Sequence, residues 1–525
     1  MKTALDWSAY QDAGMGDAYA DIPRHGGDFA KAVAVCINSR QCEAETRKGV
    51  MCPSFRVTGD PALSTGGRVR LLKASLNTVA ADAHSADATQ SEASLLDAAL
   101  ADPTLARAMD LCVACKGCKR ECESNVDMAL IKSEYLAQRV RRDGLRWRAR
   151  LFAALPHWLS RYRPAVRWLI GMRNRQPWLA QLGQRLLGIT AEVPLPEPTR
   201  APFEPDPEPA AAPASALTEA STPSLPEVVL LVDCFGRHFE PEIPRAALRV
   251  LRAAGYRVHI AEPAESDPNP KRPLCCGRTY LAQGLVEQVA DEARRLLSAL
   301  LPHARAGRWI IGLEPSCLLS LRDDHLALGL GDAARVVAER SLLLEEFLAK
   351  ELIAKRLKLP FTDAQAHDSS TTLVHGHCHQ KAVGAMKSMR KVLKWVPGLT
   401  PEMIDAGCCG MAGTFGLEQE HAELSRQMAE LHLLPQLRAN PSAPVIANGF
   451  SCRQQIRAHT TQRPRHLAQV LADALELDLD MEPQQEVATQ QAVEQNRATQ
   501  NGRAWLRHHG AAQAKQGRVS QVTER

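Results

Sequence analysis

The cysteines are the residues of this chain whose spacing most clearly indicates chemistry. All fifteen fall into motifs of the kind that bind metals. Cys112, Cys115, Cys118 and Cys122 form the pattern C-x2-C-x2-C-x3-C. In proteins with two four-iron clusters, the first three cysteines of such a run hold one cluster and the fourth reaches the other. Zinc matches this run poorly, because zinc sites usually separate their ligands into pairs. Glu123 follows the run where proline is usual.

Three more cysteines lie upstream in a less complete set. Cys36 and Cys42 have ferredoxin spacing with Ser39 in the middle position, and Cys52 is followed by proline. In two-cluster ferredoxins the last cysteine of each run binds the cluster of the other run, an arrangement we call ligand exchange. It predicts two groups of cysteines here. We call them the Cys52 set (Cys52, Cys112, Cys115 and Cys118) and the Cys36 set (Cys36, Cys42 and Cys122). The Cys52 set suits a [4Fe-4S] cluster. The Cys36 set suits a [3Fe-4S] cluster, or a four-iron cluster completed by water or Ser39. The alternative is that Cys36 and Cys42 are ordinary buried residues.

The other eight cysteines form two copies of one pattern: a single cysteine, a Cys-Cys-Gly triplet and another single cysteine. The first CCG set is Cys234, Cys275, Cys276 and Cys317, and the second CCG set is Cys378, Cys408, Cys409 and Cys452. Four thiolates are enough for one cluster, and the glycine after each pair allows a strained turn. A redox dithiol, a quinone site and a structural role remain alternatives.

Basic side chains surround one of these cysteines. His375, His377, His379 and Lys381 lie within three positions of Cys378. The imidazoles can donate to cluster sulfurs or relay protons. The other interpretation is that some of them only cap the helix that follows.

The elements that must position these cysteines change character along the chain. We expect an α+β multidomain protein with a helical ferredoxin-like iron–sulfur domain and two repeated α/β cysteine-rich domains. Strands are predicted at Val228–Val232, Arg257–Ile260, Trp309–Leu313, Thr372–His375 and Pro444–Ala447, and helices at Asp127–Arg142, Pro244–Ala254 and Lys381–Trp395. Several cysteines follow these strands, and the carboxyl ends of parallel strands are where ligands bind.

The predicted division of the chain follows its composition, since 525 residues exceed one hydrophobic core. The expected parts are an N-terminal lead-in 1–35, a helical 4Fe-4S domain 36–190, a Pro/Ala-rich linker 191–226, cysteine-rich domains 227–365 and 366–475, and a disordered tail 476–525. The net charge of +5 does not indicate nucleic-acid binding. We expect neither a signal peptide nor a membrane-spanning helix, and therefore a cytoplasmic protein whose cysteines bind metal rather than form disulfides.

One segment combines tryptophan and arginine. Trp147, Trp158, Trp168 and Trp178 lie among many arginines, leucines and alanines in residues 146–189. Such a segment can lie on the inner surface of a membrane, with arginine at lipid phosphates. The alternative is helices packed on their own domain or on a partner subunit.

Seven stretches of the chain together resemble a known family, the iron–sulfur part of FAD-dependent D-2-hydroxyacid dehydrogenases. The resemblance lies in residues 49–56, 64–72, 111–122, 312–317, 375–381, 407–413 and 448–455. The chain is also similar to the iron–sulfur subunits of glycolate oxidase and anaerobic glycerol-3-phosphate dehydrogenase, and to the cysteine-rich domains of heterodisulfide reductase. It departs from the last, because each CCG set ends in one cysteine where that enzyme has C-x2-C.

The resemblance implies an electron-transfer subunit of a D-lactate- or glycolate-type dehydrogenase. A partner FAD-linked oxidase would oxidise the 2-hydroxyacid, and this chain would pass the electrons to a quinone or another acceptor. The FAD-binding region of the family is missing here, so FAD is expected on the partner and not on this chain. A self-contained disulfide or quinone reductase is the alternative, and a structural or sensing role for the clusters is a third. The sequence identifies no catalytic residue.

Overall fold

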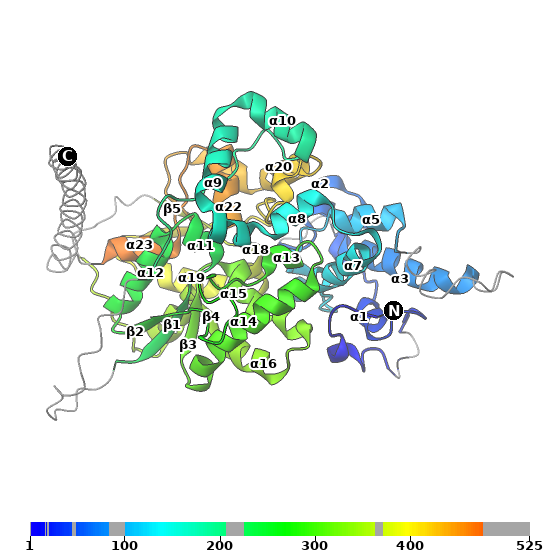
Figure 1. The fold of residues 1–525 in the computed structure, drawn as a ribbon, viewed down its shortest axis with the longest axis horizontal. Coiled ribbons are helices and arrows are strands. Elements are labelled where there is room, and N and C mark those ends of the chain that lie inside the picture. The colour runs from blue at the N-terminus through cyan, green and yellow to red at the C-terminus, as the bar shows by residue number, and fades with distance from the viewer. Residues whose placement is uncertain are drawn as a thin grey trace, which may run out of the picture. The chain divides into compact units, whose positions relative to one another are not determined.

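The computed structural model describes residues 2–15, 17, 20–44, 49–82, 100–205, 225–362 and 371–475 (Figure 1). The predicted disordered tail, 476–525, lies outside the described residues, as do residues 206–224 of the predicted linker. All described residues belong to one compact unit.

Helices make up every named element in the described part of the chain before residue 206. They are η1 Ser8–Tyr10, α1 Asp28–Ala34, η2 Gln41–Glu43, α2 Pro53–Thr58, η3 Pro61–Leu63, α3 Thr65–Asp82, α5 Pro103–Asp110, α6 Gly117–Glu121, α7 Met128–Asp143, α8 Trp147–Ala153, α9 Leu155–Arg175 and α10 Pro177–Leu187. The predicted helix Asp127–Arg142 corresponds to α7, which Asp127 caps through its side chain.

The predicted lead-in is part of the helical core. Leu5 and Trp7 are buried with helices α1, α3 and α7. The carboxylate of Glu134 on α7 accepts hydrogen bonds from the backbone of Ala4 and Leu5 and from the indole of Trp7. These contacts fix the first residues against the helices that carry the cysteine run.

The α/β part contains two parallel sheets. The first half comprises β1 Glu227–Leu231, α11 Cys234–His238, α12 Glu242–Ala253, β2 Arg257–Ile260, α13 Arg278–Leu281, α14 Val286–Arg305, β3 Trp309–Gly312, α15 Pro315–Arg322, η5 Asp324–Leu328, α16 Gly331–Glu339, β4 Ser341–Leu343 and α17 Leu344–Ile353. Its strand order is β2-β1-β3-β4, all parallel (Figure 1). The strands are rich in Val, Ile and Leu, as expected of parallel strands covered on both faces.

The second half repeats this order on a smaller scale. It comprises β5 Thr371–His375, α18 Cys378–Ala382, α19 Met386–Leu393, β6 Thr400–Met403, η6 Phe415–Leu417, α20 Ala422–Glu430, α21 Leu433–Ala439, β7 Val445–Ala447, α22 Phe450–His459 and α23 Leu467–Ala474. Its strand order is β6-β5-β7, so β5 is central as β1 is in the first half.

The two halves share one buried hydrophobic cluster, and each half also has a cluster largely of its own. Val228 and Leu230 of β1 belong to the same buried cluster as Val374 of β5 and Ile446 of β7. Helices of one half cover the other, since α12 packs against α23 and α17 packs against α19. Arg453 on α22 is buried and forms an ion pair with the buried Glu240 of the first half. The strand ends of both halves are therefore held in a fixed relation.

Two sequence-based expectations need correction. Residues 191–205 of the predicted linker pack on the protein, because the backbone of Phe203 and Thr199 bonds to Arg237 and His238 and the Phe203 ring is buried. The predicted helix Lys381–Trp395 is two helices, α18 and α19, separated by a turn at Gly384, whose φ is +77°. Among the described residues, no helix is long and apolar enough to cross a membrane.

Candidate functional site

The cysteine run lies in a loop and short helix between α5 and α7. Ala114 and Lys116 between the cysteines have left-handed backbone angles, as does Cys52 before α2. Such angles are uncommon outside glycine and mark a chain that wraps tightly. Glu121 binds the upstream segment, since its two carboxylate oxygens accept the amides of Val50 and Met51 at 2.8 and 3.0 Å. The loop of Cys52 is thereby fixed beside the run.

The structure brings together the residues of both predicted ferredoxin-type sets. Cys118 is buried near Cys52 and Cys112, and burial raises the pKa of its thiol well above the usual value. Cys36, Cys42 and Cys122 line one small cavity, together with Ser39. The pKa of Cys36 is raised by burial and by its neighbours Cys122 and Cys42. The thiols of each predicted set lie near one another, and Cys52 also interacts with Cys42 of the Cys36 set. Which cysteines share a cluster stays a prediction.

Each CCG set is also gathered in space. Cys275 interacts through its thiol with Cys234 and Cys276, and Cys276 interacts with Cys317. In the second CCG set, Cys378 and Cys408, Cys408 and Cys409, and Cys409 and Cys452 are close enough for their thiols to shift one another's pKa. The matching cysteines begin matching elements: α11 and α18 start at Cys234 and Cys378, and Cys317 and Cys452 lie in the first turns of α15 and α22.

The second CCG set lies next to the Cys52 set. Burial raises the pKa of the Cys115 thiol well above its usual value, and the nearby thiols of Cys378, Cys408 and Cys118 raise it further. His379 connects the same regions, because its Nε2 lies 3.2 Å from the carbonyl oxygen of Ala114. The Cys52 set therefore adjoins the second CCG set, and its Cys52 thiol also interacts with Cys42 of the Cys36 set.

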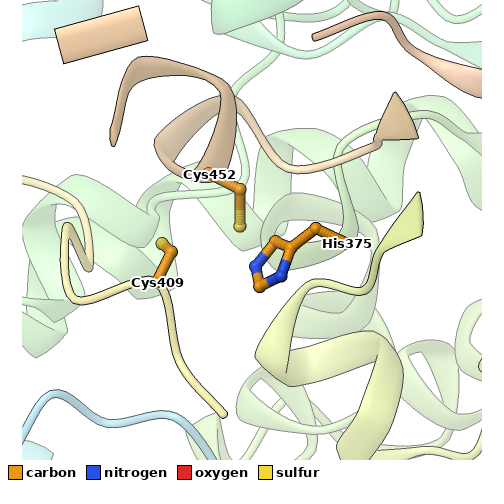
Figure 2. A group of neighbouring side chains, drawn as sticks. All are labelled: His375, Cys409 and Cys452. Atoms are coloured by element: carbon orange, nitrogen blue, oxygen red, sulfur yellow. The ribbon is translucent and has the colours of Figure 1, made fainter. Parts of the chain in front are cut away.

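His375 is a further candidate ligand or sulfur hydrogen-bond donor. It is the last residue of β5, and its ring lies close to the thiols of Cys409 and Cys452, with one ligand atom of each residue within 4.8 Å of the others (Figure 2). The side chain is buried, and neither ring nitrogen has a hydrogen-bond partner among the described residues. Burial lowers its pKa well below the usual value, so the ring is neutral. The equivalent residue of the first half, the last of β1, is Leu231.

The other basic residues near Cys378 have structural partners. His377 caps α18, because its Nδ1 accepts the amide of His379 at 3.2 Å. Asp233 occupies the same position before α11 in the first half. The ammonium of Lys381 donates to the carbonyls of Ala406 and Gly407, just before the second Cys-Cys-Gly. The helix-capping interpretation is therefore correct for His377.

Charged residues within the cysteine run bind it to the first half. The buried Lys116 ammonium pairs with Asp323 and Asp324 at 2.5 and 2.6 Å. Arg278, which follows the first Cys-Cys-Gly, pairs with Asp324 at 2.7 Å, and its guanidinium also lies 3.2 Å from His379. Sequence reasoning missed this network, because lysine between cysteines carries no signal for a partner some 200 residues away.

The donor sets and their surroundings fit iron–sulfur clusters. All fifteen cysteines are free thiols. Backbone amides point at sulfur in all four sets: Thr65 to Cys52 at 3.0 Å, Gly66 to Cys42 at 3.3 Å, Gly277 to Cys275 at 3.5 Å and Gly410 to Cys408 at 3.4 Å. Amide donors of this kind stabilise thiolates and tune cluster potentials. Glycine is required at position 410, because a Cβ there would lie 2.1 Å from the Ser425 carbonyl oxygen.

A cavity of about 280 Å³ lies where the helical part meets both halves of the α/β part. Cys378, Cys408 and Cys409 of the second CCG set line it, together with Cys112 of the Cys52 set. No cysteine of the first CCG set is among its lining residues. The cavity therefore gives a ligand access to the second CCG set.

Comparison with known proteins supports the predicted resemblance. The model of the cysteine-rich CCG domain matches residues 372–457. The chain is 24% identical over 483 residues to the D-2-hydroxyglutarate dehydrogenase of Pantoea ananatis, a match that covers 86% of this chain and 44% of that enzyme. It is 25% identical over 256 residues to one of the subunits of the anaerobic glycerol-3-phosphate dehydrogenase of Escherichia coli, covering 47% of this chain and 59% of that relative.

A shorter relative is matched almost completely. Lactate utilization protein A 1 of Bacillus mycoides is 24% identical over 260 residues, which is 47% of this chain and 96% of that protein. By contrast, this chain spans less than half the length of the D-2-hydroxyglutarate dehydrogenases that it matches. The named dehydrogenases are oxidoreductases, in agreement with the predicted class of an oxidoreductase component.

Proposed function

We propose that the chain is the iron–sulfur electron-transfer component of a flavin-dependent 2-hydroxyacid dehydrogenase of the D-lactate or glycolate type. A partner FAD subunit would supply electrons, and a quinone or another acceptor would receive them. The observation that carries the proposal is the continuity of the thiol sets, since Cys115 of the Cys52 set lies beside Cys378 and Cys408 of the second CCG set. Iron–sulfur clusters bound there would supply one-electron transfer.

The chain's own residues hold and separate the sites. The fifteen cysteines would bind the iron, one four-iron cluster in the Cys52 set, a three- or four-iron cluster in the Cys36 set and further clusters in the CCG sets. Lys116 and Arg278 hold the cysteine run against the first half through Asp324. This arrangement keeps the sets at fixed separations during electron transfer.

The test is reconstitution of the complete reaction. We expect the purified chain to contain iron but no FAD, and to oxidise no 2-hydroxyacid alone. Adding an FAD-linked oxidase should give D-lactate, glycolate or D-2-hydroxyglutarate oxidation coupled to reduction of ferricyanide. Stoichiometric flavin on the isolated chain, or no electron transfer with any such oxidase, would contradict the proposal. Disulfide reduction by the chain with an artificial donor would favour the alternative, a self-contained reductase.

We further propose that helices α8, α9 and α10 bind the inner face of a membrane. No aspartate or glutamate lies between Asp143 and Glu192. Trp168 and Trp178 are each 62% exposed, and exposed arginines accompany them at positions 146, 150, 161, 175 and 185. Exposed tryptophan with arginine suits the interface of an anionic bilayer. Packing on its own domain does not account for this exposure, and packing on a partner subunit is the alternative to the membrane.

A further inference from the structure

The turn that carries Cys452 is held by side chains of the first half of the α/β part. Arg453, next to this cysteine, forms an ion pair with Glu240. The amide of Phe450, the first residue of α22, donates to Oε2 of Glu314 at 2.7 Å. Both carboxylates belong to the first half and are buried. The start of α22 therefore depends on groups outside its own half.

Steric crowding explains why α22 takes a cap from the other half. The first half caps its own helix, since Glu314 precedes α15 and accepts the Ser316 hydroxyl at 2.8 Å. The equivalent position before α22 is Gly449. A Cβ there would lie 2.3 Å from Cδ2 of His377, so a capping side chain does not fit. Because the first amides of a helix need an acceptor, the second oxygen of Glu314 supplies it.

A third buried carboxylate of the first half, Glu345 on α17, contacts both ends of the second CCG set. Gln380, two residues after Cys378, donates to its Oε1. Asn448, four residues before Cys452, donates to its Oε2 at 3.2 Å. The side chains of all three partners are buried. One carboxylate thus connects the segments that carry the first and the last cysteine of the set.

The surroundings fix the orientation of both amides. The side-chain oxygen of Gln380 accepts the His377 amide at 2.9 Å, and that of Asn448 accepts the Leu467 amide at 3.0 Å. Both NH2 groups must therefore face Glu345, which has to accept a hydrogen bond on each oxygen. A carboxylate can do so, whereas a glutamine in its place would turn an NH2 group toward one of the two donors.

The energetics indicate that Glu345 does not serve stability. No cation pairs with its carboxylate among the described residues, whereas Glu240 has Arg453. Burial raises the pKa of Glu345 to about 7, and the hydrogen bonds from Gln380 and Asn448 act against this rise. A buried carboxylate without a cation costs folding free energy. This cost points to a role in positioning the two segments that it binds.

The first CCG set has no equivalent contact. The positions that correspond to Gln380 and Asn448 are Gly236 and Leu313, which have no side-chain amide. The two helices that begin at Cys234 and just before Cys317 are capped by side chains of the first half itself. The first set is therefore positioned within its own half, whereas the second set relies on the first half.

We propose that Glu345 is a positioning residue of the second CCG set, which holds Cys378 and Cys452 in the geometry in which their thiolates bind iron. The proposal rests on the proposed electron-transfer function, because that function places iron in this set. It deepens that function by naming what the set requires from the other half of the protein. The contacts of Glu345 lie within the protein and can be tested apart from electron transfer.

The first test is Glu345→Gln in the full iron-loaded chain. Backbone hydrogen exchange in residues 448–453 should become faster by about tenfold or more, because one buried amide donor loses its charged acceptor. Exchange in the equivalent segment 313–318 should be unchanged. The iron content should fall by about one cluster, while the EPR signals of the Cys52 set remain. Gln380→Met removes only one of the two contacts and should give smaller changes of the same kind.

Glu351→Gln is the matched control. Glu351 is another buried carboxylate on α17, but its partners, Tyr256 and Arg356, belong to the first half. This variant should leave both the exchange of residues 448–453 and the iron content as in the wild type. Equal changes in Glu345→Gln and Glu351→Gln would show a general loss of stability and overturn the positioning role.

The second test reverses the direction of one hydrogen bond. In the double variant Glu345→Gln, Asn448→Asp, the new amide can donate to the new carboxylate while its oxygen still accepts from Gln380. We expect exchange and iron content close to those of the wild type. Asn448→Asp alone places two carboxylates together and should lose iron as Glu345→Gln does. A purely structural loss would be larger in the double variant than in either single variant.

The possible failures are distinguishable. Wild-type exchange with full iron in Glu345→Gln, faster exchange with full iron, or no rescue in the double variant would each overturn the positioning role. Electron transfer by a wild-type chain without iron in the second CCG set would also overturn it and leave the proposed function intact. Loss and rescue of iron in a chain that accepts no electrons from any flavoprotein would contradict the proposed function and leave the positioning role supported.

Discussion

Cys115 lies near thiols of two different sets, and substitution of this residue tests the Cys52 set most directly. Cys115→Ser should remove one cluster and lower electron transfer to the acceptor by more than about tenfold, because a serine oxygen is a poor ligand for an iron–sulfur cluster. Iron analysis and ferricyanide reduction measure the two effects. Met15→Ser places the same side chain at an exposed position and is the control. Full iron content together with full electron transfer in Cys115→Ser would show that the motif was misassigned.

Ser39 decides the nature of the cluster in the Cys36 set. It lines the same small cavity as Cys36, Cys42 and Cys122, where a ferredoxin would have its fourth ligand. We expect the wild-type chain to give the EPR signal of an oxidised three-iron cluster. Ser39→Cys should abolish this signal and add about one iron atom per chain. Ser39→Ala is the control, because it should leave the three-iron signal in place. A wild-type chain with four-iron signals only, unaffected by Ser39→Cys, would count against ligand exchange.

His375 illustrates what sequence patterns could and could not predict at this scale. The spacing of the cysteines predicted four sets whose thiols lie near one another in the structure, whereas the assignment of cysteines to clusters stays a prediction. The histidines near Cys378 were also visible, but nothing in the spacing told a capping His377 from the unpartnered His375. The contacts of the buried His421 ring with carboxylate oxygens of Asp110 and Glu418, each at 3.0 Å, were not predicted, because Asp110 lies more than 300 residues from the other two.

At the scale of elements, the hydrophobic patterns predicted the central strands well. The predicted Arg257–Ile260 has the bounds of β2, and the other four predicted strands differ from β1, β3, β5 and β7 by one residue at one or both ends. Strands β4 and β6 were not predicted, because three or four residues with a proline or serine among them give little periodicity. The packed segment 191–205 was taken for linker, since its proline content hides the contacts of Phe203 with the first half.

Helices α8–α10 give the prediction that belongs to this scale. The chain should sediment with vesicles containing phosphatidylglycerol, and the double variant Trp168→Ala, Trp178→Ala should lower the bound fraction severalfold, because interfacial anchoring follows buried aromatic area and arginine charge. Binding should also fall with salt and on vesicles of neutral lipid only. Ile353→Ala removes a side chain that is 65% exposed elsewhere and is the control. Equal sedimentation of the double variant would place these helices against a protein partner instead.

At the scale of the whole molecule, the α/β part consists of two copies of one arrangement, and the two copies carry different residues near their cysteines. Equivalent strands end in Leu231 and His375, and equivalent helix caps are Asp233 and His377. The second half also contacts the Cys52 set and lines the cavity with three of its cysteines, whereas the first half lines it with Arg278, Phe235 and Phe239. The spacing of the two CCG sets predicted the repeat. It did not predict this asymmetry, because the asymmetry depends on how the helical part packs against the two halves. The division into separate cysteine-rich domains stays a prediction, since the halves share one buried cluster and each also has one largely of its own.

This asymmetry predicts where electrons leave the protein. Cys276→Ser and Cys409→Ser change the same position in the two CCG sets, so each variant is the control for the other. Each should lower the iron content by about one cluster, while the signals of the Cys52 set remain. Only Cys409→Ser should lower quinone reduction, by more than about tenfold, because its set lines the cavity and adjoins Cys115.

A redox titration should give the second CCG set the higher potential, since His375 can donate to its sulfurs and Leu231 cannot. Equal loss of quinone reduction in both variants would mean that electrons pass through both sets in series, and unchanged iron in both would mean that the paired cysteines act as thiols.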